Sequence, residues 1–230
     1  MKTNVLSPLL ALAAYPVHVL NGFKEYATTI RRYYPNPRFR RADLLCLWAY
    51  LTRDPHAICE HFLRDYPDDQ VQKMYGESFF TTLEKIAEAV DLDDKDVVYD
   101  LGCGRGRSVF WFNTMFGCRA VGIEINPMFV INARLIQKAL DIDNVEFILS
   151  NLMDADYSDA TVIYLYGTAL SDTAIVNLVE RFVTLKPGTR VVTVSYSLSR
   201  YTELPMFALE KTIRGKFVWG ETDIYIQRKL

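Results

Sequence analysis

The sequence predicts an α/β protein whose core is a doubly wound, mainly parallel β-sheet, with helical residues added at its N-terminus. Its 230 residues, half of them hydrophobic, suffice for one such domain and a small appendage. After residue 71, short apolar runs of strand length alternate with amphipathic stretches of helix length, which is typical of a parallel sheet covered by helices. We therefore divide the chain into a helical segment at 1–70 and an α/β domain at 71–230, with the break marked by Pro67 and the aspartates around it.

The helical segment begins with an apolar run and continues into a basic one. Residues 5–20 predict a packing helix rather than a signal peptide or membrane anchor, because Pro8 and Pro16 interrupt a run shorter than the ~20 residues of a membrane span. Residues 24–42 carry six basic residues against one acid, and they either attract an acidic protein or RNA or form a solvated helix face whose tyrosines pack on the core. Five of these basic residues would form a nucleic-acid surface: Arg31, Arg32, Arg38, Arg40 and Arg41.

The α/β domain starts with a helix predicted at 78–90, whose apolar residues recur at spacings of three and four. Short apolar runs then predict buried strands at 97–101, 120–125, 145–149, 161–166 and 190–197. Asn126 is a suitable N-cap, and Pro127 a suitable first residue, for one of the helices between these strands. Those helices are predicted at 108–115, 127–139 and 172–184.

The C-terminal tail predicts an antiparallel hairpin that closes the sheet. Its two strands are expected at 207–213 and 217–228. Gly215 and Gly220 are the expected turn residues, because glycine tolerates the backbone angles that tight turns require.

The first predicted strand runs into a loop in which glycine alternates with other residues. Gly102, Gly104 and Gly106 allow the backbone to turn sharply and to approach a ligand, since a side chain would block positive φ or fill the ligand's space. Glu124 stands twenty residues after Gly104, at the end of the next strand, where its carboxylate can accept hydrogen bonds from a ribose diol. Strand, loop, helix, strand and acid together predict a nucleotide-type cofactor site.

The spacing of the glycines narrows the choice of cofactor. Arg107 stands where a dinucleotide-binding loop would have its third glycine, which argues against NAD. The pattern Asp-x-Gly-x-Gly-x-Gly from Asp100 instead resembles motif I of the class I S-adenosylmethionine (SAM) methyltransferases, and Gly-Ile-Glu-Ile-Asn at 122–126 resembles their acidic second motif. The resemblance implies a seven-stranded Rossmann-like sheet with a terminal antiparallel hairpin, SAM as cofactor and S-adenosylhomocysteine as product.

Two further stretches resemble the non-SET protein-lysine methyltransferases, a group that includes the disruptor-of-telomeric-silencing type histone enzymes and the small prokaryotic and mitochondrial lysine methyltransferases. They are Tyr-Gly-Glu-Ser at 75–78 and Lys-Pro-Gly-Thr-Arg-Val-Val at 186–192. The resemblance covers about residues 71–200 and implies methylation of a protein lysine. We expect Tyr75 and Tyr166 at the catalytic site, Tyr166 because it ends the fourth predicted strand, where open α/β sheets place ligands; the alternative for Tyr166 is packing in the core. The resemblance implies these cofactor-binding residues: Tyr75, Glu77, Ser78, Asp100, Gly102, Cys103, Gly104, Glu124, Ile125, Asn151 and Leu152.

The stretch after the fourth strand bears on the methyl acceptor. Residues 166–170 read Tyr-Gly-Thr-Ala-Leu where the histone enzymes have Asn-Asn-Phe-Ala-Phe, so the small prokaryotic enzymes resemble this stretch better. The Asn/Asp-Pro-Pro-Tyr/Phe motif associated with methylation of bases is missing, and protein lysine is therefore preferred. The alternatives are an RNA or small-molecule methyltransferase and a SAM-binding module without turnover. We expect residues 1–70 to help form the substrate site and residues 75–78 to form a lid over the cofactor.

Charge and cysteine content indicate the surroundings in which the protein works. A net charge of −2 and a pI near 6.0 give no overall attraction to nucleic acid or to an anionic membrane. The four cysteines lack the spacing of a disulfide framework, which favours a reducing cytoplasm. His56, Cys59 and His61 fit no zinc pattern, so we predict no metal site. All three histidines precede the α/β domain, and catalysis by histidine is therefore not expected.

Overall fold

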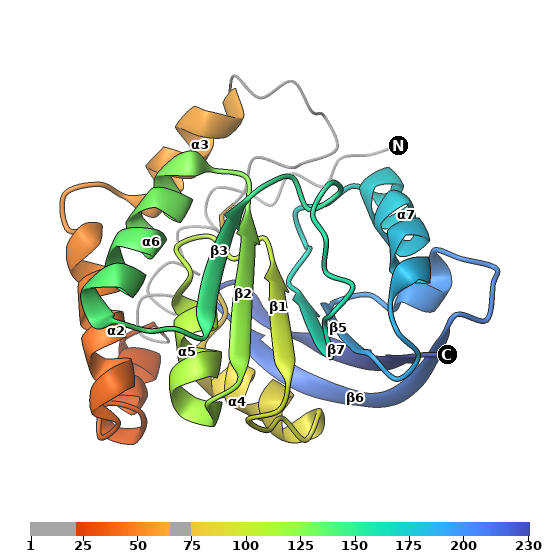
Figure 1. Ribbon diagram of the computed structural model, residues 1–230, viewed down its shortest axis with the longest axis horizontal. Helices are drawn as coiled ribbons and strands as arrows, with labels where there is room; N and C mark the ends of the chain where they lie inside the picture. The colour runs from red at the N-terminus through yellow and green to blue at the C-terminus, as the bar shows by residue number, and fades with distance from the viewer. Residues whose placement is uncertain (1–21, 65–74) are drawn as a thin grey trace, which may run out of the picture.

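The structure, a computed structural model, describes residues 22–64 and 75–230 and is built on one seven-stranded sheet (Figure 1). The strands lie in the order β3-β2-β1-β4-β5-β7-β6. Neighbours among β1 to β5 are parallel, and β7 is antiparallel to both β5 and β6, so the predicted sheet with a terminal hairpin is confirmed. The bounds are β1 Val97–Leu101, β2 Arg119–Glu124, β3 Val145–Leu149, β4 Val162–Leu165, β5 Arg190–Val194, β6 Phe207–Phe217 and β7 Gly220–Lys229.

Helices cover both faces of the sheet, as a doubly wound fold requires. Figure 1 shows α4, α5 and α6 on one face, with α2 outside them, and α7 on the other face. A helix that includes residues 22–32 precedes α2. The bounds are α2 Pro37–Ala49, α3 Pro55–Arg64, α4 Phe80–Ala89, α5 Arg107–Phe116, α6 Pro127–Leu140 and α7 Asp172–Arg181, with short 3-10 turns at Phe182–Thr184 and Leu198–Arg200.

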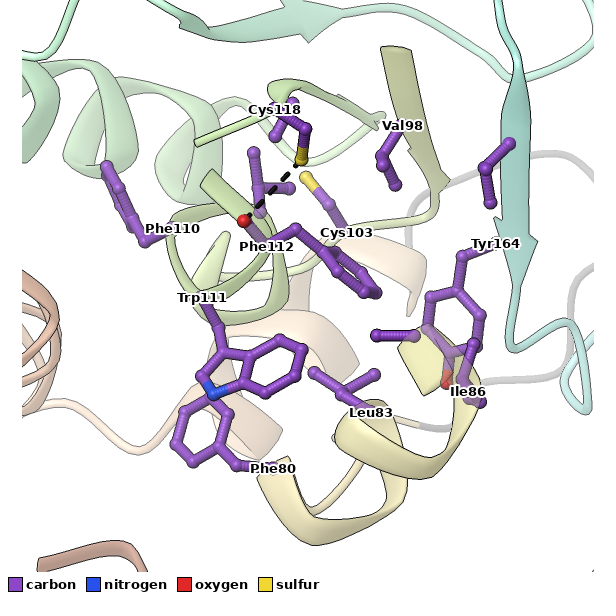
Figure 2. Packing of buried hydrophobic residues seen from close by; sticks show 14 of the residues in the cluster. Phe80, Leu83, Ile86, Val98, Cys103, Phe110, Trp111, Phe112, Cys118 and Tyr164 are labelled. Atoms are coloured by element: carbon purple, nitrogen blue, oxygen red, sulfur yellow. Dashed lines mark hydrogen bonds between the residues drawn. The ribbon is translucent and has the colours of Figure 1, made fainter. Parts of the chain in front are cut away.

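The α5 helix is buried around much of its circumference. Four consecutive residues, Val109 to Phe112, are at most 2% exposed, although an amphipathic helix would bury only one stripe. In Figure 2, Phe112 extends toward Tyr164 of β4, while Trp111 packs beside Phe80 of α4. On the outer side the Trp111 ring meets Tyr33 edge to face, with 5.8 Å between ring centroids. The N-terminal helices therefore complete the core of the α/β domain.

The terminal hairpin differs from the prediction at Gly215, which was expected in a turn and lies inside β6. A Cβ atom at this position would come within 2.4 Å of Ile224 Cδ1 and 2.9 Å of Thr82 Cγ2. The prediction was wrong because this glycine serves close packing of α4 and β7 against β6. The turn itself lies between Phe217 and Gly220, and it carries Trp219.

Strands β4 and β5 end earlier than predicted, at Leu165 and Val194. Gly167 and Ser195 follow with positive φ angles of 55° and 74°, which turn the chain away from the sheet. Tyr166 consequently lies in a loop at the carboxyl edge of the sheet rather than in a strand.

The predicted packing helix at 5–20 and the predicted break at 65–70 lie outside the described residues. Within residues 22–64 and 75–230, no helix is both long enough and apolar enough to span a membrane.

Candidate functional site

A cavity opens at the carboxyl ends of β1, β2, β3 and β4. The chain leaves β1 toward β2 and β3 on one side and returns to β4 on the other, and doubly wound sheets bind ligands at this reversal of strand order. The N-terminal segment takes part, because α3 contributes Cys59, Phe62 and Leu63 to the wall.

Eight of the twelve predicted site residues line this cavity, and four do not. Ser78 instead shares a short hydrogen bond with the Tyr164 hydroxyl, and the Glu77 carboxylate forms ion pairs with Arg105 and Arg107. The sulfur of Cys103 packs where a Cβ of Gly122 would stand, 2.5 Å from it, and Asp100 lies behind the glycine-rich loop. The lining set is Tyr75, Gly102, Gly104, Glu124, Ile125, Asn151, Leu152 and Tyr166.

The alternating glycines of the loop serve different purposes. All three have positive φ, between 53° and 85°. Beside Gly102 no atom of the described chain lies within 4 Å of a Cβ position, so this side of the loop leaves space for a ligand. The Tyr75 ring lies 3.0 Å from the Cβ position of Gly104, and the Phe147 ring lies 2.4 Å from that of Gly106. Close contact with a ligand is therefore possible at Gly102, while the other two glycines admit aromatic rings of the protein itself.

Glu124 is held at the end of β2 by backbone groups. One carboxylate oxygen accepts a hydrogen bond from the Gly104 N–H at 2.9 Å, and the other accepts from the N–H groups of Ile125 and Asn126, each at 2.8 Å. Burial raises the pKa of Glu124 above its ordinary value, although these three hydrogen bonds act in the opposite direction. Each carboxylate oxygen offers about two lone-pair sites, so one site remains to accept from a ribose hydroxyl.

Replacing Glu124 by glutamine is expected to weaken S-adenosylhomocysteine binding at least tenfold. The amide NH2 of the new side chain would face a backbone N–H donor, and a lost hydrogen bond to a charged group costs about 1.5–3 kcal/mol. Calorimetric titration measures the affinity, and thermal unfolding checks that the variant is folded. Glu146→Gln makes the same change at an exposed ion pair with Arg119 and should bind like the wild type. Equal affinities in both variants would show that Glu124 does not hold the ligand.

Asp100 lies at the end of β1 and is 4% exposed. Its carboxylate accepts a short hydrogen bond from the Ser108 hydroxyl in the first turn of α5. Burial raises the pKa of Asp100 to about 7, with a further contribution from the negative charge of Glu124, while the Ser108 hydrogen bond acts to lower it. The structure thus places a carboxyl group that titrates near neutral pH directly under the cofactor loop.

Sequence reasoning missed the charged partners of Glu77. Arg105 donates from Nε and Nη2 to the two Glu77 oxygens at 2.7 Å each, and Arg107 donates from Nη1 at 3.0 Å. Arg107 also pairs with Asp43 of α2 at 2.7 Å. Burial alone would raise the pKa of Glu77, but these arginines and the Tyr75 hydroxyl outweigh it and lower the pKa to about 2. In the sequence, these partners could have been suspected from two arginines at the glycine-rich loop, Arg105 and Arg107, and from Asp43 among the apolar residues of α2.

Tyr166 and Trp219 form an aromatic wall of the cavity. The indole N–H of Trp219, in the β6–β7 turn, donates to the Tyr166 hydroxyl at 2.6 Å. Trp219 also stacks on Phe217, with 5.4 Å between centroids and planes 7° apart. The Tyr166 ring lies 3.1 Å from the Cβ position of Gly76, so even a methyl group there would require a small movement of the ring. Trp219 was missed because only tertiary structure brings the hairpin turn to Tyr166.

Two asparagines complete the polar lining. Asn126 caps α6, as predicted, with its Oδ1 accepting from the Met128 N–H at 3.0 Å. Its Nδ2 is buried and has no hydrogen-bond partner in the described part of the chain, so this donor remains for a ligand. The Asn151 Oδ1 accepts from the Met153 N–H at 2.9 Å and keeps a second lone pair. The free donor, the Glu124 carboxylate and the open side of Gly102 fit a ligand with ribose, amino and carboxylate groups.

Comparison with known proteins agrees with this geometry. The family model of the ANTKMT methyltransferase domain matches residues 100–204. The protein-lysine N-methyltransferase of Saccharolobus islandicus is 28% identical over 130 residues, which are 56% of this chain and 80% of that protein. Phosphoethanolamine N-methyltransferase 3 of Arabidopsis thaliana is 33% identical over 183 residues, or 74% of this chain. This chain spans just over a third, 37%, of the plant protein.

One solved structure is matched over most of its own length. The RNA methyltransferase from Salinibacter ruber in complex with S-adenosylhomocysteine is 34% identical and superimposes with a TM-score of 0.54. The match covers 65% of this chain and 90% of that one. Sequence motif, sheet order and cavity agree with this relationship, and the chain belongs to the class I SAM-dependent methyltransferases.

Proposed function

We propose that this protein transfers a methyl group from SAM to a lysine side chain of a protein, releasing S-adenosylhomocysteine. The observation that carries the proposal is the wall that Tyr166 and Trp219 form in the cofactor cavity. Aromatic faces attract ammonium and methylammonium groups, so they suit an amine that enters the cavity and leaves it methylated. The ANTKMT domain match and the Saccharolobus islandicus relative support this choice of acceptor.

The residues of the cavity act by positioning the reactants. Bound SAM supplies a methyl group on a positively charged sulfur, which is already an activated leaving group. Burial raises the pKa of Tyr166, so its hydroxyl stays protonated at neutral pH. Trp219 occupies one lone pair of that hydroxyl, which leaves a second lone pair to orient an incoming amine. Holding two reactants in line lowers the activation barrier, because their translational and rotational entropy has already been lost on binding.

Loss of the lysine proton does not need a dedicated base here. Among the described residues that line the cavity, Glu124 is the only carboxylate, and three backbone N–H groups hold it. Burial beside a positive charge lowers the pKa of a lysine amine, so a larger fraction of the amine is neutral and able to attack the methyl group. We therefore expect the rate to rise with pH as the acceptor lysine loses its proton.

RNA is the second candidate acceptor. The Salinibacter ruber relative is an RNA methyltransferase, and Arg38, Arg40 and Arg41 are exposed on α2 of this chain. Against this choice, two of the aromatic residues in the basic stretch are buried, while Tyr26 is 39% exposed. Tyr33 and Phe39 are 1% exposed and are therefore unable to stack on bases. Arg32 already pairs with Glu84 at 3.0 Å.

The compartment we propose is the reducing cytoplasm. All four cysteines are free thiols, which such a compartment would preserve.

Labelled SAM incubated with a lysate of the native organism tests the acceptor directly. Product is divided, treated with protease or ribonuclease, and chromatographed as amino acids, nucleosides and small molecules. Counts in methyl-lysine are expected. Counts confined to nucleosides would establish the RNA alternative, and counts confined to small molecules would favour an activity like that named for the Arabidopsis relative. Absence of any S-adenosylhomocysteine production would indicate a binding module without turnover.

Replacing Trp219 by phenylalanine is expected to lower kcat/KM for the acceptor about two- to tenfold. Phenylalanine keeps an aromatic face but removes the donor to Tyr166, and a net hydrogen bond contributes roughly 0.5–1.5 kcal/mol. Affinity for S-adenosylhomocysteine should change less than twofold. Trp48→Phe, at a 71% exposed position on α2, is the matched control. Equal losses of turnover and of ligand affinity in Trp219→Phe would assign Trp219 to the cofactor instead.

A further inference from the structure

A second set of charged residues lies against the cavity without lining it. We call this set the Glu77 clamp: Glu77, Arg105, Arg107 and Asp43. We infer that Arg105 and Arg107 are positioning residues, which hold the Tyr-Gly-Glu-Ser segment and α2 against the glycine-rich loop and thereby set the affinity for the cofactor. The inference concerns the cofactor half of the site, and it holds whichever molecule accepts the methyl group.

The first contact of the clamp fixes Tyr75. The Glu77 carboxylate receives two hydrogen bonds from Arg105, one from Arg107 and one from the Tyr75 hydroxyl. Its acceptor sites are thereby filled, so Glu77 is not available to bind the cofactor itself. The same contacts place the Tyr75 ring against Gly104, where it forms part of the cavity wall.

The second contact joins the N-terminal segment to the same loop. Asp43 of α2 has no exposed side-chain surface and accepts from Arg107 Nε at 2.8 Å and Nη2 at 2.7 Å. The Tyr34 hydroxyl donates to the other Asp43 oxygen at 3.0 Å. The α2 helix contributes no residue to the cavity, and this ion pair fastens it to the first residue of α5, directly after the glycine-rich loop.

Aromatic rings support both arginines. The guanidinium carbon of Arg105 lies 5.1 Å from the centre of the Tyr50 ring, and that of Arg107 lies 4.7 Å from the centre of Phe80. Tyr50 contacts Phe129, and Phe129 contacts Tyr75, so a continuous chain of rings leads from Arg105 back to the cavity. A planar guanidinium can bind a carboxylate through two nitrogens and stack on a ring at once, which a lysine ammonium cannot do.

The clamp also balances its own charge, with two arginines against two acids. Removing one member leaves a neighbouring charge poorly compensated in a largely buried place, where the side chains of Arg105 and Arg107 are 11% and 18% exposed. The neighbours can relieve that charge only by moving toward water, and this movement carries Tyr75 away from Gly104.

The test compares Glu77→Gln and Arg105→Lys with the wild type in full-length protein. Each variant is expected to bind S-adenosylhomocysteine at least tenfold more weakly by calorimetry. Amide hydrogen exchange at residues 75–78 should be faster in both. In steady-state assays KM for SAM should rise more than kcat falls. Glu146→Gln makes the same substitution at a surface ion pair and should change none of these readouts.

Arg105→Lys keeps the positive charge and is the variant more certain to fold. Affinity within twofold of the wild type in folded Arg105→Lys and Glu77→Gln would overturn the inference. Unchanged exchange at residues 75–78 despite weaker binding would overturn it as well, because the loss would then not pass through Tyr75. Ligand affinity and amide hydrogen exchange are measured without a methyl acceptor. Both measurements therefore remain interpretable if the acceptor is not lysine.

Discussion

Replacing Asp100 by asparagine is expected to stabilise the folded protein at pH 8 by up to about 4 kcal/mol. Burial, the largest cause, raises the pKa of Asp100 from 3.8 to about 7 in the folded chain. Folding therefore favours the protonated carboxyl group. This contribution to stability is complete below pH 3.8 and is lost as the pH rises to 7. Asparagine does not ionise, and its Oδ1 can still accept from Ser108.

Urea unfolding at two pH values checks this prediction. The advantage of Asp100→Asn should be largest at pH 8 and should shrink to about 1 kcal/mol at pH 4.5, where the wild-type carboxyl is mostly protonated in the folded state. A difference that does not vary with pH would mean that Asp100 ionises as easily in the folded chain as in the unfolded one.

The same substitution is expected to weaken cofactor binding. An ionised Asp100 attracts the positively charged amino group of S-adenosylhomocysteine, so wild-type affinity should rise as the pH increases through about 7. The Asp100→Asn variant should bind about tenfold more weakly at pH 8, with a flat pH dependence, which calorimetry at pH 6 and pH 8 measures. Stability gained together with affinity lost would show that the buried carboxylate is retained for binding.

Replacing Gly106 by alanine is expected to destabilise the protein by about 2–5 kcal/mol. A residue other than glycine at φ 80° costs about 1–2 kcal/mol. The new Cβ would also lie 2.4 Å from the Phe147 ring, and overpacking of this kind costs roughly 1–3 kcal/mol more. Urea unfolding of the variant and the wild type gives the difference directly.

Two other glycines provide matched controls for Gly106. Gly188 has a φ of 92°, and no atom of residues 22–64 or 75–230 lies within 4 Å of its Cβ position, so Gly188→Ala should lose only the backbone contribution. Gly102 has a φ of 85° and equally open surroundings, but it lines the cavity, so Gly102→Ala should lose similar stability and most of its affinity for S-adenosylhomocysteine. Equal destabilisation at Gly106 and Gly188 would show that the Phe147 ring moves aside without cost.

The sequence alone predicted the parts of this protein that depend on local order. Strand and helix periodicities predicted the doubly wound sheet and its terminal hairpin, and the N-cap Asn126 predicted the start of α6. The glycine-rich loop and Glu124 were predicted to belong to one cofactor site. The Gly104 N–H indeed donates to Glu124. These features follow from spacing along the chain, which a single sequence displays.

Only the tertiary structure decided which distant side chains meet. Glu77 pairs with Arg105, and Tyr166 with Trp219, across 28 and 53 residues. The sequence predicted Gly215 to lie in a turn, but in the structure it lies in β6, where α4 and the hairpin approach each other closely. No periodicity encodes such contacts, because they depend on how whole elements pack. For the same reason a predicted cofactor ligand, Glu77, became the centre of a clamp: its carboxylate is satisfied by arginines that only the folded chain brings to it.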